Sequence, residues 1–189
     1  MTTDQDRWNA RWKVRGLASS GSSSLLELVG PWLPAAGSAL DVAGGGSGDA
    51  VALAVAGLTV TGADVSDAGL ALNRKRAAQS GVAITTVQVD LENDALPPGP
   101  WAVITLANFS HGPLFGCLAS ALAPGGILAV VIATTTNLDR HAKPPLSFLL
   151  ESEEILGLVG NLEVLHHSES WRVNGRHEAW LVARRSVYS

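Results

Sequence analysis

Apolar residues along this chain fall into two alternating patterns. Short, nearly continuous apolar or alternating runs, typical of strands, occur at 38–42, 58–64, 82–90, 101–107 and 127–133. Between them lie segments with apolar residues three or four positions apart, the spacing of one helical face. They predict helices at 25–29, 49–56, 68–79 and 113–122. Strands that alternate with helices favour a parallel sheet with both faces covered.

Small and capping residues mark the ends of these helices. Gly57 and Gly81 follow two of them, as glycine does at a left-handed helix end. Asp67 is predicted to cap the helix at 68–79, and Pro113 opens the helix that follows the fourth strand. The segment 16–24 is rich in glycine and serine and predicts a flexible connection, with one of Ser22 to Ser24 capping the next helix.

The alternation changes after the fifth strand. Ser152 is predicted to cap a short helix that begins with two glutamates. Strands are predicted at 162–171 and 178–184, with the tight-turn sequence Asn174-Gly175 between them. The whole pattern predicts an α/β fold: a Rossmann-like, doubly wound, seven-stranded sheet with five parallel strands and a C-terminal antiparallel hairpin.

The N-terminal segment has a helical pattern of its own at 7–15. Trp8 and Trp12 lie four residues apart, so they share one helical face. We expect residues 1–24 to form an N-terminal helix or lid and a flexible segment, and residues 25–189 to form a single domain. The helix either closes over a bound ligand or is simply stapled to the sheet by its tryptophans.

Composition narrows the possible partners and compartment. The chain has 189 residues, of which 47% are hydrophobic, and a net charge of −4, which gives no basic footprint for nucleic acid. Apolar runs are too short to span a membrane. A single cysteine, Cys117, allows no internal disulfide and suits the reducing cytoplasm; its helical spacing from three leucines predicts a buried thiol. No histidine or cysteine spacing suggests a metal. We expect a monomer or a homodimer.

The most informative stretch lies between the first strand and its helix. The strand ends at Asp41-Val42 and is followed by Ala43, Gly44, Gly45, Gly46 and Ser47. A tight turn of small residues before a helix lets the backbone approach a ligand, and the helix start offers free N–H groups. This arrangement is typical of nucleotide-type ligand sites in α/β sheets.

These residues resemble the first motif of class I S-adenosylmethionine-dependent methyltransferases. The chain is most similar to small bacterial methyltransferases of the tellurite-resistance type, in the stretches 39–54, 60–66, 107–114, 122–126 and 148–154. Ala43 and Ser47 depart from the usual glycines of that motif. After the fourth strand the chain reads Asn108-Phe109-Ser110, without the Pro-Pro-aromatic sequence of enzymes that methylate amide or nucleobase nitrogens.

The resemblance implies S-adenosyl-L-methionine as cofactor and methyl transfer to a small-molecule acceptor. It places the cofactor's amino-acid tail and ribose over Ala43 to Ser47, with Asp41 near the ammonium. Asp64, followed by Val65, would accept from the ribose hydroxyls. The remaining implied contacts are Asp90 and Leu91 at the adenine, Asn108 at the methyl-transfer site, and Arg11 at the cofactor carboxylate.

Some alternatives stay open at this stage. His111 follows the fourth strand and could act as a base, or it could be a loop histidine without a chemical role. A nicotinamide-dependent oxidoreductase is disfavoured, because the phosphate fingerprint fails at Asp49 and Val51. A non-catalytic cofactor-binding protein on the same scaffold is the main alternative to an enzyme.

Overall fold

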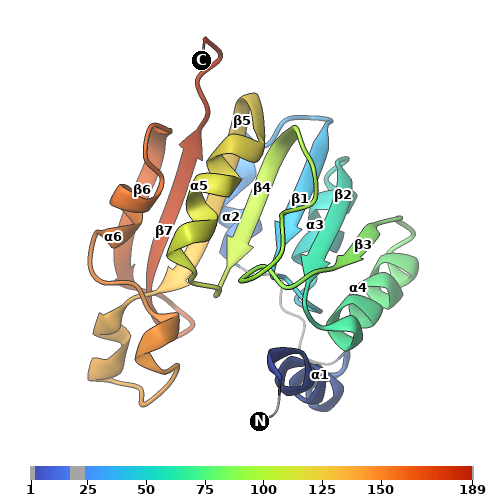
Figure 1. The fold of residues 1–189 in the computed structure, drawn as a ribbon, viewed down its shortest axis with the longest axis horizontal. Helices are drawn as coiled ribbons and strands as arrows, with labels where there is room; N and C mark the ends of the chain where they lie inside the picture. The colour runs from blue at the N-terminus through green and yellow to red at the C-terminus, as the bar shows by residue number, and fades with distance from the viewer. Residues whose placement is uncertain (1–2, 18–23, 189) are drawn as a thin grey trace.

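The computed structural model of the protein describes residues 3–17 and 24–188. At its centre is a seven-stranded sheet with the order β3-β2-β1-β4-β5-β7-β6 (Figure 1). The strands are β1 (Ser38–Val42), β2 (Thr59–Asp64), β3 (Thr85–Gln88), β4 (Trp101–Ala107), β5 (Leu122–Ala133), β6 (Glu163–Trp171) and β7 (His177–Arg184). The first five are parallel, and β6 and β7 form an antiparallel hairpin at one edge, which confirms the predicted fold.

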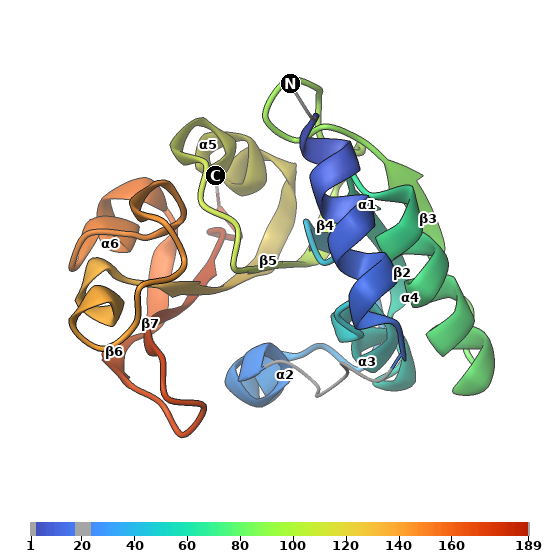
Figure 2. The ribbon, with the colours of Figure 1, turned by 90° about the horizontal axis from the view of Figure 1, so that it is seen from below.

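Helices cover both faces of the sheet (Figure 2). They are α1 (Asp4–Arg15), α2 (Ser24–Val29), α3 (Asp49–Val55), α4 (Asp67–Gln79), α5 (Gly112–Ala121) and α6 (Glu154–Leu158). The short 3₁₀ helices η2 (Gly30–Trp32), η3 (Thr135–Asp139) and η4 (Leu146–Phe148) lie in the connections. The helices α2 and α3 lie on one face and α5 and α6 on the other, while α4 packs beside β2 and β3.

The aliphatic fifth strand shows why both faces must be covered. Its side chains alternate between the two layers, since successive residues of a strand point to opposite faces. Leu128, Val130 and Ile132 belong to the core under α5 and α6, and Ile127, Ala129 and Val131 belong to the core under α2. Each fully buried leucine or isoleucine contributes about 1.5–3 kcal/mol to folding.

The parallel strands bring their carboxyl ends to one edge of the sheet, the lower edge in Figure 1. The tip of the β6–β7 hairpin reaches the same edge, because Glu178 at the start of β7 pairs with Ala133 at the end of β5. The helix α1 lies below this edge on the side of β2, and the segment 135–150 lies below it on the side of β5. The two segments therefore flank the ends of the central strands.

Two predicted helix caps are wrong. Ser66, and not Asp67, caps α4: its backbone is extended, and its hydroxyl accepts a hydrogen bond of 3.0 Å from Gly69 N–H. Asp67 is already the first helical residue. At α6 the N-cap position is held by Glu153 in a left-handed conformation without a side-chain cap, because the Ser152 hydroxyl donates to Glu169 on β6 instead.

The bounds of two strands and the placement of the cysteine also differ from the predictions. Ordered pairing of β3 with β2 covers only Thr85–Gln88, although apolar residues extend beyond it. The strand β5 begins at Leu122, since Leu122 pairs with Trp101 across a register shift. Cys117 is exposed, because the buried face of α5 is formed by Leu114, Phe115 and Leu118, and Cys117 projects from its other side.

The remaining local predictions agree with the structure where it describes them. The helix predicted at 7–15 is present and begins earlier, at Asp4, with Thr3 as its cap. Gly175 adopts a left-handed conformation in the hairpin turn, with φ of 80°. Residues 18–23 of the predicted flexible segment, including two of the three candidate serine caps, lie outside the described residues. Over the described ranges, we find no helix with the length and apolarity needed to cross a membrane.

Candidate functional site

The carboxyl end of β1 places Asp41 beneath the glycine-rich loop. Asp41 is 1% exposed and accepts a hydrogen bond of 3.0 Å from the hydroxyl of Thr105 on β4. Its Oδ2 atom has no hydrogen-bond partner among the described residues, and it lies so close to Gly44 that a Cβ there would be 2.0 Å away. Burial, reinforced by the nearby Asp49 charge, raises the pKa of Asp41 well above its ordinary value.

The loop itself is fixed by its backbone. Ala43 and Gly45 both have left-handed backbones, with φ of 54° and 51°. The N–H of Ala43 donates to the carbonyl of Ala63 at 2.8 Å, and the buried Asn73 amide donates to the carbonyl of Gly45 at 2.9 Å. Ala43 therefore adopts the conformation that a glycine supplies at lower cost.

The end of the loop turns into α3 through a serine and an aspartate. The hydroxyl of Ser47 donates to a carboxylate oxygen of Asp49 at 2.8 Å and accepts from the N–H of Asp49 at 3.2 Å. The serine at this departure from the family motif thus stabilises the start of α3 locally. Its hydroxyl takes the role of a turn-forming side chain.

Asp64, at the end of β2, lies next to this loop because β2 is paired with β1. One carboxylate oxygen accepts a hydrogen bond of 2.7 Å from Ser66 N–H. Asp64 is 7% exposed, and burial raises its pKa to about 6, against the opposing hydrogen bonds from the backbone of Ser66 and Gly45. Half-buried Val65 follows it, with its carbonyl accepting from Gln88 at 3.3 Å.

A tryptophan of the N-terminal helix fills the space over two of the loop glycines. A Cβ on Gly45 would lie 2.5 Å from Nε1 of Trp12, and one on Gly46 would lie 3.1 Å from the same indole. A Cβ on Gly69 of α4 would also be too close, at 2.8 Å from Trp12 Cδ1. Trp12 is 7% exposed. Because these glycines have no side chains, the indole ring of Trp12 packs directly on their backbone.

Asn9 fastens the same helix to the start of α4. Its Oδ1 accepts from the Ser66 hydroxyl at 2.6 Å and from Ala68 N–H at 3.2 Å, and its Nδ2 donates to Asp67 at 2.6 Å. The structure therefore packs α1 chiefly against α4, with Trp12 on the loop next to Asp64.

Arginines on α1 point to other parts of the site. The guanidinium of Arg11, the predicted partner of a cofactor carboxylate, is exposed and lies over its neighbour Trp8, 5.0 Å from the ring centroid. The guanidinium of Arg7 lies over Phe148, 5.8 Å from its ring centroid. This second contact connects α1 with the segment after β5, so the two segments that flank the strand ends touch each other.

The predicted adenine residues follow β3. Asp90 is held within its own turn, where its carboxylate accepts from Glu92 N–H at 3.1 Å and from the Asn93 side chain at 2.8 Å. Leu91 is buried in the core beneath α5. Both lie on the carboxyl side of the sheet, two strands away from β1.

Asn108 and His111 follow β4, the central strand. Asn108 has a left-handed backbone, with φ of 59°, and its Oδ1 accepts a hydrogen bond of 2.5 Å from Arg176 on the hairpin. His111 is half-buried at the N-cap position of α5, with its ring 6.4 Å from that of Phe109. Across the described ranges, we find no hydrogen bond to the imidazole of His111.

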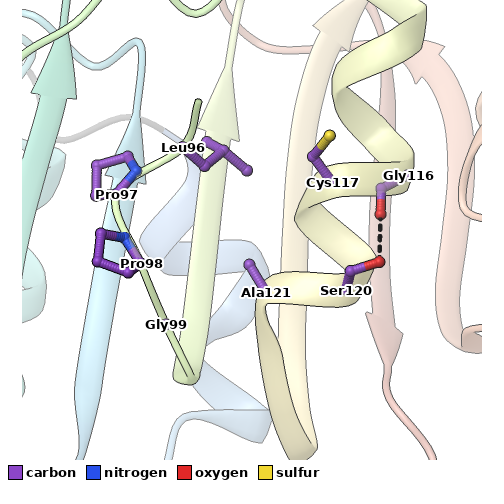
Figure 3. A pocket seen from close by; sticks show the side chains of 8 residues that line it. All are labelled: Leu96, Pro97, Pro98, Gly99, Gly116, Cys117, Ser120 and Ala121. Carbon is purple, nitrogen blue, oxygen red and sulfur yellow. Dashed lines mark hydrogen bonds between the residues drawn. The ribbon is translucent and has the colours of Figure 1, made fainter. Parts of the chain in front are cut away.

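Two shallow hollows lie in the described part of the structure at different edges of the sheet, and one of them is near these residues. A hollow of about 530 Å³ lies between the loop before β4 and the outer side of α5 (Figure 3). It is lined by Cys117 and Ser120, whose hydroxyl donates to Gly116, and it lies beside the amino end of β4, away from Asp41 and Asp64. The second hollow, of about 480 Å³, lies by the hairpin at the carboxyl edge.

Sequence reasoning missed three contributors to this site. The sequence placed Trp12 on a helix that closes over a ligand or is stapled to the sheet, but not on the loop glycines, although Gly69 in the first turn of α4 was a signal of close packing there. Asn9 and Arg176 carry no local signal, since each acts on residues more than 50 positions away. Their roles depend on how distant elements pack.

Comparisons with known proteins agree with this geometry. A sequence family described as a methyltransferase domain matches residues 39–126, from β1 into β5. Comparison with curated protein sequences finds no significant match. Among solved structures, a protein studied for converting a disulfide bond into a thioacetal group during echinomycin biosynthesis superposes with a TM-score of 0.76, at 16% identity over 99% of this chain and 94% of that one.

Two further structures are similar in fold. TehB from Haemophilus influenzae has a TM-score of 0.73 and 16% identity, covering 96% of this chain and 67% of its own. A TehB-like methyltransferase from Corynebacterium glutamicum has a TM-score of 0.70 and 16% identity, covering 96% and 98%.

The fold and the family match together define a Rossmann-like methyltransferase domain. Residues 39–126 match the methyltransferase-domain family, and the structural neighbours with this fold include TehB and other S-adenosylmethionine-dependent methyltransferases. The cofactor of this class is S-adenosyl-L-methionine. The unpartnered oxygen of buried Asp41 and the acceptor capacity of Asp64 fit a cationic ligand that also carries hydroxyl groups.

Proposed function

We propose that the protein methylates a small-molecule acceptor by in-line displacement at the sulfonium methyl of S-adenosyl-L-methionine. The cofactor supplies an electrophilic methyl group, which bonds to a lone pair of the acceptor as the carbon–sulfur bond breaks. Alignment and exclusion of water dominate such a transfer. The chain therefore needs residues that hold both partners at the ends of β1, β2 and β4.

The observation that carries this proposal is the position of Asp64 beside the loop 43–48. Its carboxylate is held by the N–H of Ser66 at 2.7 Å and keeps acceptor capacity for the hydroxyls of a ribose. Asp41 lies buried beneath the loop with its pKa raised, and an ammonium bound above it would stabilise the charged form of this carboxyl. Ala43 and Gly44 present the part of the loop that Trp12 does not cover.

The acceptor site follows from the same geometry. Asn108 ends the central strand and would frame the transferred methyl group. His111 is three residues further on, and its ring nitrogen would accept a proton from an acceptor that must lose one. Arg11, Val65, Asp90 and Leu91 would complete the cofactor contacts. We include α1 as a lid, since its Arg7 contacts Phe148 on the opposite side of the strand ends.

Calorimetric titration with S-adenosyl-L-methionine tests the cofactor site. We expect binding by the unaltered protein and a loss of at least about tenfold in affinity for Asp64→Ala, since a charge-assisted hydrogen bond is removed. Asp139→Ala, an exposed aspartate on η3, is the control. No binding by the unaltered protein would reject the proposal. Tight binding without turnover over a wide set of acceptors would support the alternative, a non-catalytic cofactor-binding protein.

A further inference from the structure

The hollow at the carboxyl edge is lined by basic side chains. Its walls are the loop after β5 and the tip of the β6–β7 hairpin, and its lining residues are Asn137, Arg140, His141, Ala142, Lys143 and Arg176. Two permanent cations and a histidine come from four consecutive positions of the loop, and a third cation comes from the hairpin. Such a grouping is unexpected in a chain whose net charge is −4.

The hollow is held in shape by contacts within its walls. The guanidinium of Arg140 stacks over Trp171, 3.9 Å from the ring centroid. The ring of His141 donates to the carbonyl of Gly175 at 2.7 Å. Asn137, only 1% exposed, donates to the carbonyl of Lys143 at 3.0 Å. The loop and the hairpin are therefore fixed to each other before any ligand arrives, which lowers the entropic cost of binding.

The charges of the hollow are only partly balanced by the protein. Arg176 has a partner, the buried carboxylate of Glu178 at 3.4 Å. In the described residues, Arg140 and Lys143 form no ion pair. The neighbouring acidic side chain on the loop, Asp139, is exposed and does not line the hollow. Two positive charges thus face the hollow without a carboxylate beside them.

The hollow borders the predicted methyl-transfer site through one residue. Arg176 lines it and donates a hydrogen bond of 2.5 Å to Asn108, at the end of the central strand. A molecule with one end between Arg140 and Lys143 would therefore reach toward Asn108 along Arg176. This places an anion-binding group beside, and not at, the position of the reacting atom.

We propose that this hollow binds a carboxylate or phosphate group of the methyl acceptor. The acceptor is therefore an organic anion, and the atom that receives the methyl group is separate from its acidic group. That the bound anion is the methyl acceptor rests on the proposed function. Arg140 supplies a planar pair of donors suited to an oxyanion, and Lys143 supplies a point charge. Arg176 positions Asn108 and closes the side toward the strand ends.

Anion binding can be measured without turnover. The probes are benzoate, phenyl phosphate and neutral benzamide, titrated into the full-length protein and followed by NMR chemical shifts. We expect benzoate or phenyl phosphate to bind, benzamide not to bind, and Arg140→Gln with Lys143→Gln to weaken binding about tenfold or more. Lys75→Gln, an exposed lysine on α4, should change nothing. The stronger of the two anions identifies the acidic group.

Two results would overturn the inference. One is equal binding of benzamide and the anions; the other is unchanged anion affinity in the double variant, with unfolding curves confirming that it is folded. Binding of S-adenosyl-L-methionine is measured on the same samples. If the cofactor binds and the anions do not, only this inference fails; if the anions bind and the cofactor does not, the proposed methyl transfer fails instead.

Discussion

The indole of Trp12 lies directly on the Cα of Gly45, so that a Cβ at Gly45 would be 2.5 Å from Nε1 of the ring. The glycine belongs to the loop after β1, and the tryptophan belongs to a helix near the N-terminus. This contact joins the glycine-rich loop to the helix that packs on it. The stability of the loop and the position of α1 are therefore coupled.

Replacing Gly45 by alanine should destabilise the protein by about 1–3 kcal/mol, because the methyl group overlaps the indole and the backbone φ is 51°. Urea unfolding followed by tryptophan fluorescence measures the loss. Gly116→Ala is the matched control, since nothing lies within 4 Å of its Cβ position and alanine favours helix α5. If Trp12→Ala does not reduce the penalty of Gly45→Ala, the coupling between the two residues is refuted.

Replacing Asn9 by alanine should release α1 from the start of α4. The variant loses hydrogen bonds to Ser66, Asp67 and Ala68, worth about 1–2 kcal/mol together in a partly buried position. We expect trypsin to cut α1 several-fold faster, at the basic residues of the helix, before the rest of the chain unfolds. Val14→Ala, at a side chain that is 89% exposed, is the control. Equal cleavage rates for the two variants would contradict this role.

The unusual carboxyl of Asp64 makes stability depend on pH. Its pKa in the folded protein is about 6, above the ordinary value of 3.8. The folded state therefore binds this proton more tightly than the unfolded state, and the free energy of unfolding should fall as pH rises from about 4 to 6, by up to roughly 3 kcal/mol. Above that range the contribution of Asp64 is constant.

Comparison with Asp64→Asn isolates this contribution. The variant should show a smaller decline over the same window, with the remainder due to Asp41, whose pKa is also raised. Affinity for S-adenosyl-L-methionine in the unaltered protein should increase through about pH 6 as the carboxylate forms. Urea unfolding and calorimetry at pH 4.5, 5.5, 6.5 and 7.5 test both statements, and parallel pH curves for the two proteins would refute them.

Ala43 stands at a position where the family usually has glycine, and it adopts a left-handed backbone with φ of 54°. Ala43→Gly should therefore leave stability unchanged or raise it by up to about 1 kcal/mol, because relief of strain exceeds the entropy that glycine adds to the unfolded chain. Ala43→Val should lower stability by more than about 1 kcal/mol, since a β-branched residue fits this conformation poorly. Thermal unfolding of both variants measures these changes in stability. A loss of stability in the glycine variant would show that Ala43 is unstrained.

The strands and helices could be predicted from local sequence, because hydrophobic periodicity and turn residues lie within each segment. The aliphatic run of β5, the alternation of β2 and the sequence Asn174-Gly175 each carry their own structure. The order of the motifs, from Asp41 through the glycines to Asp64, indicated the fold through its resemblance to a family. Errors occurred where two local signals competed, as at Ser66 and Asp67, both good helix caps, of which only the serine has an extended backbone.

Only the tertiary structure decided which residues meet at the site. Trp12 could not be placed on Gly45 and Gly69 from its spacing, since that contact requires α1 to pack on α4. Arg176 meets Asn108 over 68 positions because β7 pairs antiparallel with β5 and brings the hairpin tip to the carboxyl edge. The pattern of a segment largely fixes its own conformation, but contacts between segments depend on the packing of the whole sheet.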